Sequence, residues 1–150
     1  MSAPPPLSWR SGRRSRAERI DIMPNTTIET RAGWITDASA VIEAVQSALR
    51  AALRLPEWDR TLRLMQHAPD HFAVPPGRGP HYTLIEVTMF SGRSLAAKRA
   101  LYQAIVRNLG ALGVPADDIK ITLIEVPPEN FGIRGGQPAS EVELGFKIEV

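Results

Sequence analysis

Two stretches of this chain, Leu53–Leu64 (LRLPEWDRTLRL) and Leu112–Leu123 (LGVPADDIKITL), share one pattern. A shift of 59 residues places one on the other, with Leu53, Leu55, Pro56, Asp59 and Leu64 falling on Leu112, Val114, Pro115, Asp118 and Leu123. The same shift places Ile42 on Leu101 and Ala52 on Ala111. Repetition at a fixed period indicates a duplicated structural unit. The chain is therefore predicted to contain two copies of one motif.

Each copy has the pattern of a strand, a helix and a second strand. In the first, residues 24–30 read as a strand, and Thr36 or Asp37 is a good N-cap for the helix that follows. Apolar residues recur at helical spacing on one face, at Val41, Ile42, Val45, Leu49 and Ala52. Pro56 is expected to end the helical segment, and residues 61–66 alternate as a strand does.

The second copy contains a segment rich in β-branched and aromatic residues, Tyr82–Phe90, as expected of a central strand. Ser94 is the expected N-cap of a helix that runs to Leu112, with an apolar face of Leu101, Ile105, Leu109 and Leu112. Gly113 is well placed to stop that helix. Strands are predicted at Ile119–Val126 and, by alternation, at Val142–Val150.

Strand–helix–strand units pair their strands in parallel through a right-handed crossover. Two units predict an α/β (α+β in some schemes) fold, in which one four-stranded sheet carries two helices on one face, with an additional C-terminal strand. The opposite face would be bare, and apolar residues on both faces of Tyr82–Phe90 suggest that self-association covers it. The segments His67–Pro80 and Pro127–Ser140, rich in proline and glycine, are expected to be irregular loops.

Composition narrows the class of protein. The length of 150 residues and the 43% hydrophobic content suit one globular domain. No apolar run is long enough for a membrane span. The absence of cysteine excludes disulfides, cysteine nucleophiles and thiolate metal sites, and is compatible with a cytoplasmic location.

The basic character of the chain resides in residues 1–22, which contain five arginines and two acids. The remaining residues contain 13 basic and 14 acidic groups, so a nucleic-acid partner is expected only if this arm binds one. Three interpretations stay open: a start assigned too far upstream, a disordered tail, or an arm that binds nucleic acid or membrane. The domain itself is expected to span residues 23–150.

The order of several motifs resembles the tautomerase superfamily. These motifs are Met23-Pro24 at a strand start, the doubled unit, Gly92–Ser94 before Lys98–Tyr102, and Glu129–Gly132 near the end. The chain is similar to 4-oxalocrotonate tautomerase-like proteins of double length, the group that includes malonate semialdehyde decarboxylase. The resemblance covers residues 23–150. It implies the tautomerase fold, a homotrimer with N-terminal prolines at its active sites, and enol or enolate chemistry.

Pro24 is the first candidate catalytic residue. Initiation at Met23 followed by removal of the methionine would make Pro24 the N-terminal residue. An N-terminal proline carries a secondary amine, whereas the same residue inside a chain is an amide without a usable lone pair. Burial and a neighbouring cation would lower the pKa of this amine toward the working range of a general base. The alternative is an ordinary proline at the start of an edge strand.

Arg93 directly follows the predicted central strand. Its guanidinium offers two parallel donors to a carboxylate, so it could hold an oxo-acid and polarise the developing enolate. The alternative is a solvated arginine in a turn. The decarboxylase pattern has two arginines one residue apart here, whereas this chain has only Arg93, with Gly92 before it, which favours tautomerisation over decarboxylation.

Asp59 matches the family's catalytic aspartate, which implies that it activates water or guides the proton. Its repeat counterpart Asp118 has no such implied role, so both residues could instead be turn aspartates that bond their own backbone.

In the glycine-rich loop, Arg134 is a candidate second carboxylate clamp and Phe131 a candidate apolar wall that excludes water. The three histidines show no metal-ligand spacing, so no metal is predicted.

The sequence therefore predicts a cofactor-independent tautomerase, an isomerase that interconverts keto and enol forms of a small oxo-acid or aryl-pyruvate-like substrate. Pro24 would be the base, Arg93 would bind the carboxylate or enolate oxygen, and Asp59 would orient or polarise. One alternative is a hydratase-decarboxylase acting on a 3-oxo acid such as malonate semialdehyde. The other is a catalytically silent binding protein in which residues 1–22 keep Pro24 an amide.

Overall fold

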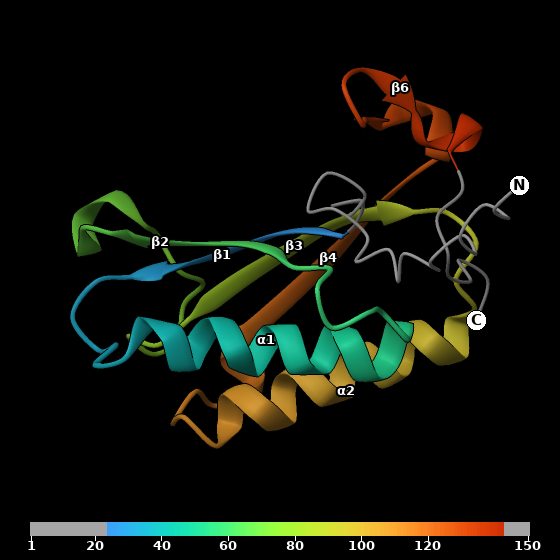
Figure 1. Cartoon of the computed structure of the whole chain (residues 1–150). Coiled ribbons are helices and arrows are strands. Elements are labelled where there is room, and N and C mark those ends of the chain that lie inside the picture. The colour runs from blue at the N-terminus through green and yellow to red at the C-terminus, as the bar shows by residue number, and fades with distance from the viewer. Residues whose placement is uncertain (1–23, 143–150) are drawn as a thin grey trace, which may run out of the picture.

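The computed structural model describes residues 24–142, so the predicted arm 1–22 and residues 143–150 of the predicted last strand lie outside it. Four strands form one sheet in the order β2-β1-β3-β4. They are β1 (Asn25–Arg31), β2 (Thr61–His67), β3 (Thr83–Phe90) and β4 (Ile119–Val126). Two helices, α1 (Ala38–Leu53) and α2 (Leu95–Gly110), lie side by side on one face of the sheet (Figure 1).

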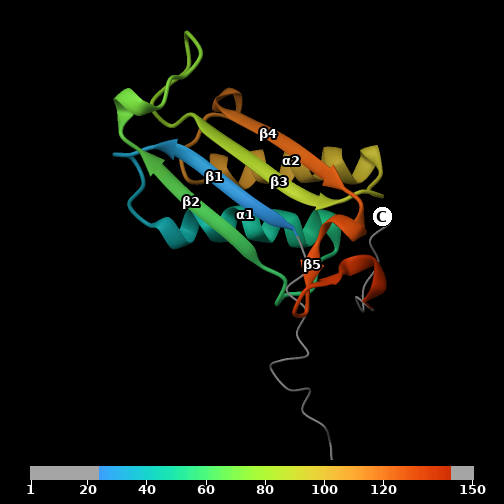
Figure 2. The same cartoon turned by 90° about the horizontal axis from the view of Figure 1, so that it is seen from above.

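The strand directions confirm the duplicated architecture. β1 pairs with β2 in parallel and β3 pairs with β4 in parallel, while β1 and β3 are antiparallel. The two strand–helix–strand units therefore lie head to tail across the β1–β3 pair, as the view onto the sheet shows (Figure 2). This arrangement places equivalent parts of the two units at opposite ends of the sheet.

Side chains at the predicted N-caps begin both helices. The Asp37 carboxylate accepts the N–H of Ala40 at 3.2 Å, and the Ser94 hydroxyl accepts the N–H of Ala97 at 3.1 Å. α1 ends before Pro56, because Arg54 takes a left-handed conformation (φ 53°) and closes the last turn. α2 also ends before the predicted Leu112, and Gly113 (φ 93°) turns the chain away from the helix.

The core lies between the helices and the sheet. Its fully buried side chains come from both units and include Ile28, Val45, Leu49, Leu53, Ile85, Val87, Leu101, Ile105 and Leu109. Each such side chain contributes about 1.5–3 kcal/mol through removal from water. Leu112 departs from the predicted apolar face and is 39% exposed, because α2 has already ended there. Within residues 24–142, no helix is long and apolar enough to cross a membrane.

The face of the sheet away from the helices is mixed in polarity, and β3 has apolar residues on both faces, with Leu84 next to Glu86 on the outer one. On β3, Ile85 and Val87 are buried toward the helices, whereas Glu86 on the other face is exposed. Met65 and Ile124 are exposed on that same outer face, at 38% and 41%. Apolar and polar side chains therefore alternate across a surface that this chain leaves largely uncovered.

The connections contain more local structure than the sequence suggested. A short 3₁₀ helix, η2 (Pro69–His71), follows β2, and η3 (Ala116–Asp118) precedes β4. The segment predicted as a loop after β4 contains η4 (Pro128–Asn130), a hairpin of β5 (Gly132–Ile133) and β6 (Gln137–Pro138), and η5 (Ala139–Glu141). A tight turn explains the hairpin, because Gly136 donates to the Ile133 carbonyl at 3.2 Å. The hairpin stands beyond the sheet on the side away from the helices (Figure 1).

Candidate active site

The strand directions gather several of the predicted site residues at one end of the sheet, which we call the Pro24 end. β1 and β2 begin there, and β3 and β4 end there. Asn25 of β1 pairs with both Thr61 of β2 and Thr88 of β3. Pro24 directly precedes β1, Asp59 lies just before β2, and Arg93 lies just after β3. Pairing of distant segments, rather than proximity in sequence, therefore brings these three residues to a common end.

All three residues are buried, which is unusual for an aspartate and an arginine. Pro24 is buried, the Asp59 residue is 0% exposed, and Arg93 is 8% exposed. Burial lowers the pKa of the Arg93 guanidinium below its usual value, and the charge of Asp59 acts in the opposite direction. Asp59 and Arg93 thus lie close enough to interact electrostatically. The alternative of a solvated Arg93 in a turn is contradicted by this burial.

Asp59 and Asp118 occupy the same kind of turn but have different side-chain environments. The N–H of Asp59 donates to the Pro56 carbonyl at 3.1 Å, and that of Asp118 donates to the Pro115 carbonyl at 3.0 Å. The Asp118 carboxylate accepts the N–H of Gly79 at 3.1 Å and so fixes a neighbouring loop. The backbone role is common to both copies, whereas only Asp59 has its charge next to a buried arginine.

Gln46 is a contributor to this end that the sequence did not reveal. Its residue is 1% exposed, and its Nε2 donates to the backbone carbonyl of Asp59 at 3.0 Å. The hydrogen bond ties α1 to the turn that carries Asp59, so Gln46 is a positioning residue. A polar side chain among the apolar positions of a core-facing helix was the signal that could have identified it.

The predicted residues of the glycine-rich loop lie in different settings. Phe131 is half-buried and packs edge-on against Phe90, the last residue of β3, with ring centroids 5.1 Å apart. This contact attaches the segment after β4 to the Pro24 end. Arg134 is exposed in the β5–β6 turn, with a φ of 48°. Arg134 is thus carried by a hairpin anchored at this end, although its side chain faces solvent rather than the core.

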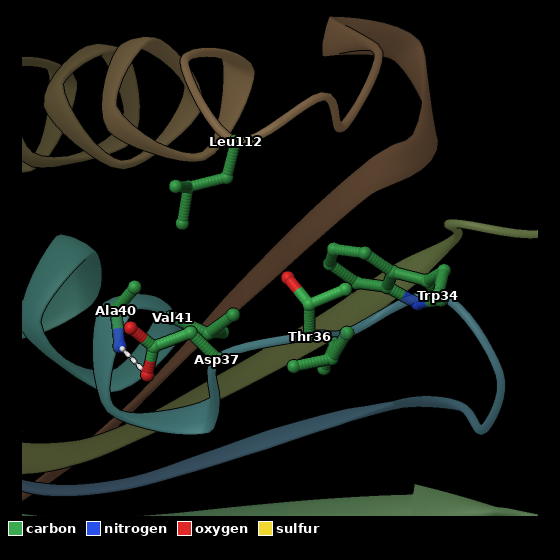
Figure 3. Close-up of a pocket in the computed structure, with 7 residues that line it drawn as sticks. Trp34, Thr36, Asp37, Ala40, Val41 and Leu112 are labelled. Atoms are coloured by element: carbon green, nitrogen blue, oxygen red, sulfur yellow. Dashed lines mark hydrogen bonds between the residues drawn. The ribbon is translucent and has the colours of Figure 1, made fainter.

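The histidines lie elsewhere. His81 stacks on Trp34 at the opposite end of the sheet, where β1 ends and β3 begins, and His67 stacks on Phe72 in the same region. Among residues 24–142, no group of three or more histidine, aspartate or glutamate side chains is arranged to hold a metal ion. A small cavity of about 70 Å³ also lies at that opposite end, between Trp34, Val41 and Leu112 (Figure 3).

Comparison with known proteins shows the family to which this chain belongs. The model of the family described as "Tautomerase enzyme" matches residues 59–134. The 2-hydroxymuconate tautomerase of Comamonas testosteroni is 36% identical over 61 residues, which are 40% of this chain and 92% of that protein. The chain belongs to the tautomerase family and is an enzyme of the isomerase class.

Solved structures share the fold over the doubled length. A crystal structure of FG41 malonate semialdehyde decarboxylase, inhibited by 3-bromopropiolate, has a TM-score of 0.67 and 26% identity over 71% of this chain and 86% of that one. A fused 4-OT in the form of a symmetric trimer has a TM-score of 0.69 and 23% identity over 77% of this chain and 95% of that one. The resemblance to the tautomerase fold predicted from the sequence is therefore confirmed.

Proposed function

We propose that this enzyme interconverts the keto and enol forms of a small oxo-acid at the Pro24 end, without a cofactor. The observation that carries the proposal is the meeting of a buried proline, a buried arginine and a buried aspartate at one end of the sheet. The proposal includes a chain that begins at Pro24, through initiation at Met23 and removal of that methionine. Only then does Pro24 carry an amine.

Pro24 is the general base. Its nitrogen lone pair takes a proton from the carbon next to the substrate carbonyl. The electron pair of that C–H bond forms a carbon–carbon double bond, and the π pair of the carbonyl moves to its oxygen to give an enolate. The proton is then returned to the enolate oxygen, which completes the enol; the reverse steps give the ketone. Burial and a cation at the same end both disfavour the protonated amine, which brings the pKa of a proline amine closer to neutral pH.

Arg93 binds the substrate carboxylate or the enolate oxygen. Its fixed donors stabilise negative charge most strongly in a site shielded from water, and its burial meets that condition. Asp59 balances the Arg93 charge and orients the guanidinium or the proton. Phe131 forms an apolar wall that excludes water, and Arg134 approaches from the hairpin as a second clamp for the carboxylate.

Replacement of the base tests the mechanism. In the chain that begins at Pro24, Pro24→Ala replaces the secondary amine, and we expect keto–enol conversion of phenylpyruvate to fall about 100-fold or more. Pro127→Ala, at an exposed proline after β4, is the matched control and should retain full activity. Unchanged activity of Pro24→Ala in a folded protein would overturn the assignment of the base.

A second candidate is hydration and decarboxylation of a 3-oxo acid. It is favoured by the similarity to the FG41 malonate semialdehyde decarboxylase over most of both chains. In this alternative, protonated Pro24 polarises the carbonyl and Asp59 activates water. Gly92 in place of a second arginine argues against it. Release of carbon dioxide from malonate semialdehyde, abolished by Asp59→Asn, would support the decarboxylase; its absence alongside tautomerase activity would exclude it.

We also propose that the enzyme assembles as a homotrimer. The outer face of the sheet exposes Met65 and Ile124 and is not covered by the helices. A fused 4-OT of the same fold forms a symmetric trimer. Light scattering coupled to size-exclusion chromatography should give three times the monomer mass, and Met65→Glu should lower that mass. A wild-type monomer would contradict this assembly.

A further inference from the structure

A cavity of about 300 Å³ lies at the end of the sheet opposite Pro24, where β1 ends and β3 begins. Its walls include Arg31 and Trp34 from the β1 end and Pro69, Pro80 and His81 from the segment between β2 and β3. Ligand pockets for small molecules range from about 300 to 1,000 Å³, so this cavity has the size of a small ligand. The mechanism proposed above uses none of these residues.

The internal repeat makes this cavity the counterpart of the Pro24 end. The 59-residue shift places Pro24 on Thr83, Asp59 on Asp118 and Phe131 on Phe72. The structure keeps the correspondence, because η2 and η4 occupy equivalent positions after β2 and β4. The two units are head to tail, so the counterpart of one end falls at the other.

Within residues 24–142, this second end does not reproduce the three groups proposed for proton transfer at the Pro24 end. Thr83 lies inside the chain at the start of β3, so its nitrogen is an amide and no base. The Asp118 carboxylate is occupied by the N–H of Gly79 at 3.1 Å. The loop of residues 32–37, which corresponds to the loop that carries Arg93, contains no basic residue. We therefore expect no catalysis here.

Arg31 provides a positive charge at the second end. Its repeat counterpart at the Pro24 end is Phe90, which is uncharged. The Arg31 Nε donates to the Phe72 carbonyl at 2.7 Å, which holds the guanidinium in place. Within residues 24–142, no carboxylate lies within ion-pair distance of Arg31. The terminal nitrogens of a guanidinium are a pair of parallel donors suited to a carboxylate. Arg31 is thus a fixed cation at the wall of the cavity.

A rigid aromatic surface stands beside this cation. The rings of Trp34 and His81 are stacked, with centroids 4.7 Å apart and planes 24° apart. The Trp34 indole donates to the Thr30 hydroxyl at 3.0 Å, and His81 Nδ1 bonds the Gly113 carbonyl at 3.0 Å. Both rings are therefore held by hydrogen bonds as well as by their stacking, so a ligand would meet an ordered surface at a low cost in conformational entropy.

We propose that this cavity is a second binding site, which takes a planar carboxylate, aromatic or conjugated, and does not transform it. Arg31 pairs with the carboxylate group, and the Trp34–His81 surface contacts the flat remainder of the ligand. In this proposal the second end of the duplicated fold binds a carboxylate, while the base lies at the Pro24 end. This proposal stands on the geometry of the cavity and does not depend on the catalytic role of Pro24.

A titration with benzoate, followed by the tryptophan indole N–H signals in nitrogen–proton NMR spectra of the full chain, tests the site. Trp34→Phe and Trp58→Phe assign their two signals and distinguish them from that of Trp9, and Trp58, next to Asp59, reports on the Pro24 end. We expect a saturable shift of the Trp34 signal. Arg31→Gln should raise the dissociation constant for benzoate, measured at this signal, at least tenfold. Arg78→Gln, in the same loop region, should leave that constant unchanged.

Arg31→Lys keeps the charge without the paired donors and should bind benzoate with intermediate affinity. This variant still tests the site if Arg31→Gln fails to fold. A Trp34 signal that stays fixed up to the solubility limit of benzoate would overturn the proposal. So would a shift of equal affinity in wild type and in folded Arg31→Gln. A shift confined to Trp58 would show that benzoate binds the Pro24 end alone, and would equally overturn it.

Discussion

The two ends of the sheet began as copies, and their differences show which parts of the motif are structural and which are chemical. Both ends keep the proline–aspartate turn, with the same backbone hydrogen bond of 3.1 Å at Asp59 and 3.0 Å at Asp118. At one end the carboxylate lies near a buried arginine; at the other it fixes the backbone of a loop. The turn is therefore a structural feature of both copies. The group next to each carboxylate determines whether that carboxylate contributes to chemistry or to stability.

Among the variants that test this comparison, replacement of the buried Arg93 is expected to have the largest effect on activity. Arg93→Gln removes charged donors from a site shielded from water, and we expect kcat/KM to fall about 100- to 1,000-fold. Arg99→Gln on the exposed surface of α2 is the matched control and should be neutral. Steady-state kinetics with phenylpyruvate measures both. A fall of less than twofold for folded Arg93→Gln would remove Arg93 from the mechanism.

The two aspartates should separate activity from stability. Asp59→Ala should lower kcat on the order of 100-fold, because Arg93 loses the neighbouring charge that we propose orients it. Asp118→Ala should leave kcat unchanged and lower the free energy of unfolding by about 1–3 kcal/mol, because the N–H of Gly79 loses its acceptor. Denaturant titrations and kinetics of both variants test this pair. Equal loss of activity in the two would contradict the division of roles.

Replacement of each of the two phenylalanines at counterpart positions, Phe131 and Phe72, should give a smaller difference in activity. Phe131→Leu loses the edge-on contact with Phe90, worth about 0.5–1.5 kcal/mol, and admits water to the Pro24 end, so kcat/KM should fall several-fold. Phe72→Leu, at the counterpart position, loses its stack on His67 and should be destabilised to a similar extent with full activity. If Phe72→Leu is the more impaired catalyst, the two ends are assigned the wrong way round.

The smallest effect is expected next to Asp59, at an ion pair open to solvent. Arg60 and Glu43 meet at 3.2 Å with about half of each side chain exposed. Arg60→Gln should cost less than about 1 kcal/mol of stability, with an effect that shrinks further at high salt, and should leave kcat within twofold of wild type. Urea unfolding at low and high ionic strength measures it. A large loss of activity would mean that the site extends to the solvent-exposed side of this turn.

The repeat predicted the fold well because two copies of one sequence pattern form two copies of one strand–helix–strand unit. Leu101, Ile105 and Leu109 revealed the buried face of α2, and Asp37 and Ser94 marked both helix starts. Met65, Ile124 and the hairpin after β4 were harder to place, because outer-face polarity and a tight turn depend on register and local φ rather than on apolar spacing.

The candidate site could be predicted only in outline. Strand order brings Asp59 and Arg93 together, and a linear sequence does not state how strands pair across two units. Gln46 escaped prediction because its contact is with a backbone carbonyl, which every residue has. The cavity beside Arg31 escaped because its aromatic wall, Trp34 and His81, is assembled from two distant loops.

The central claim is that a free Pro24 amine makes one end of the sheet catalytic, and the chain's own N-terminus tests it most directly. Phenylpyruvate conversion is measured across pH for a chain that begins at Pro24 and for the full 150-residue chain, with intact mass confirming each start. The account predicts activity in the shorter chain that declines at low pH as the amine is protonated, and a rate about 100- to 10,000-fold lower in the full chain. Equal rates and pH profiles would contradict it.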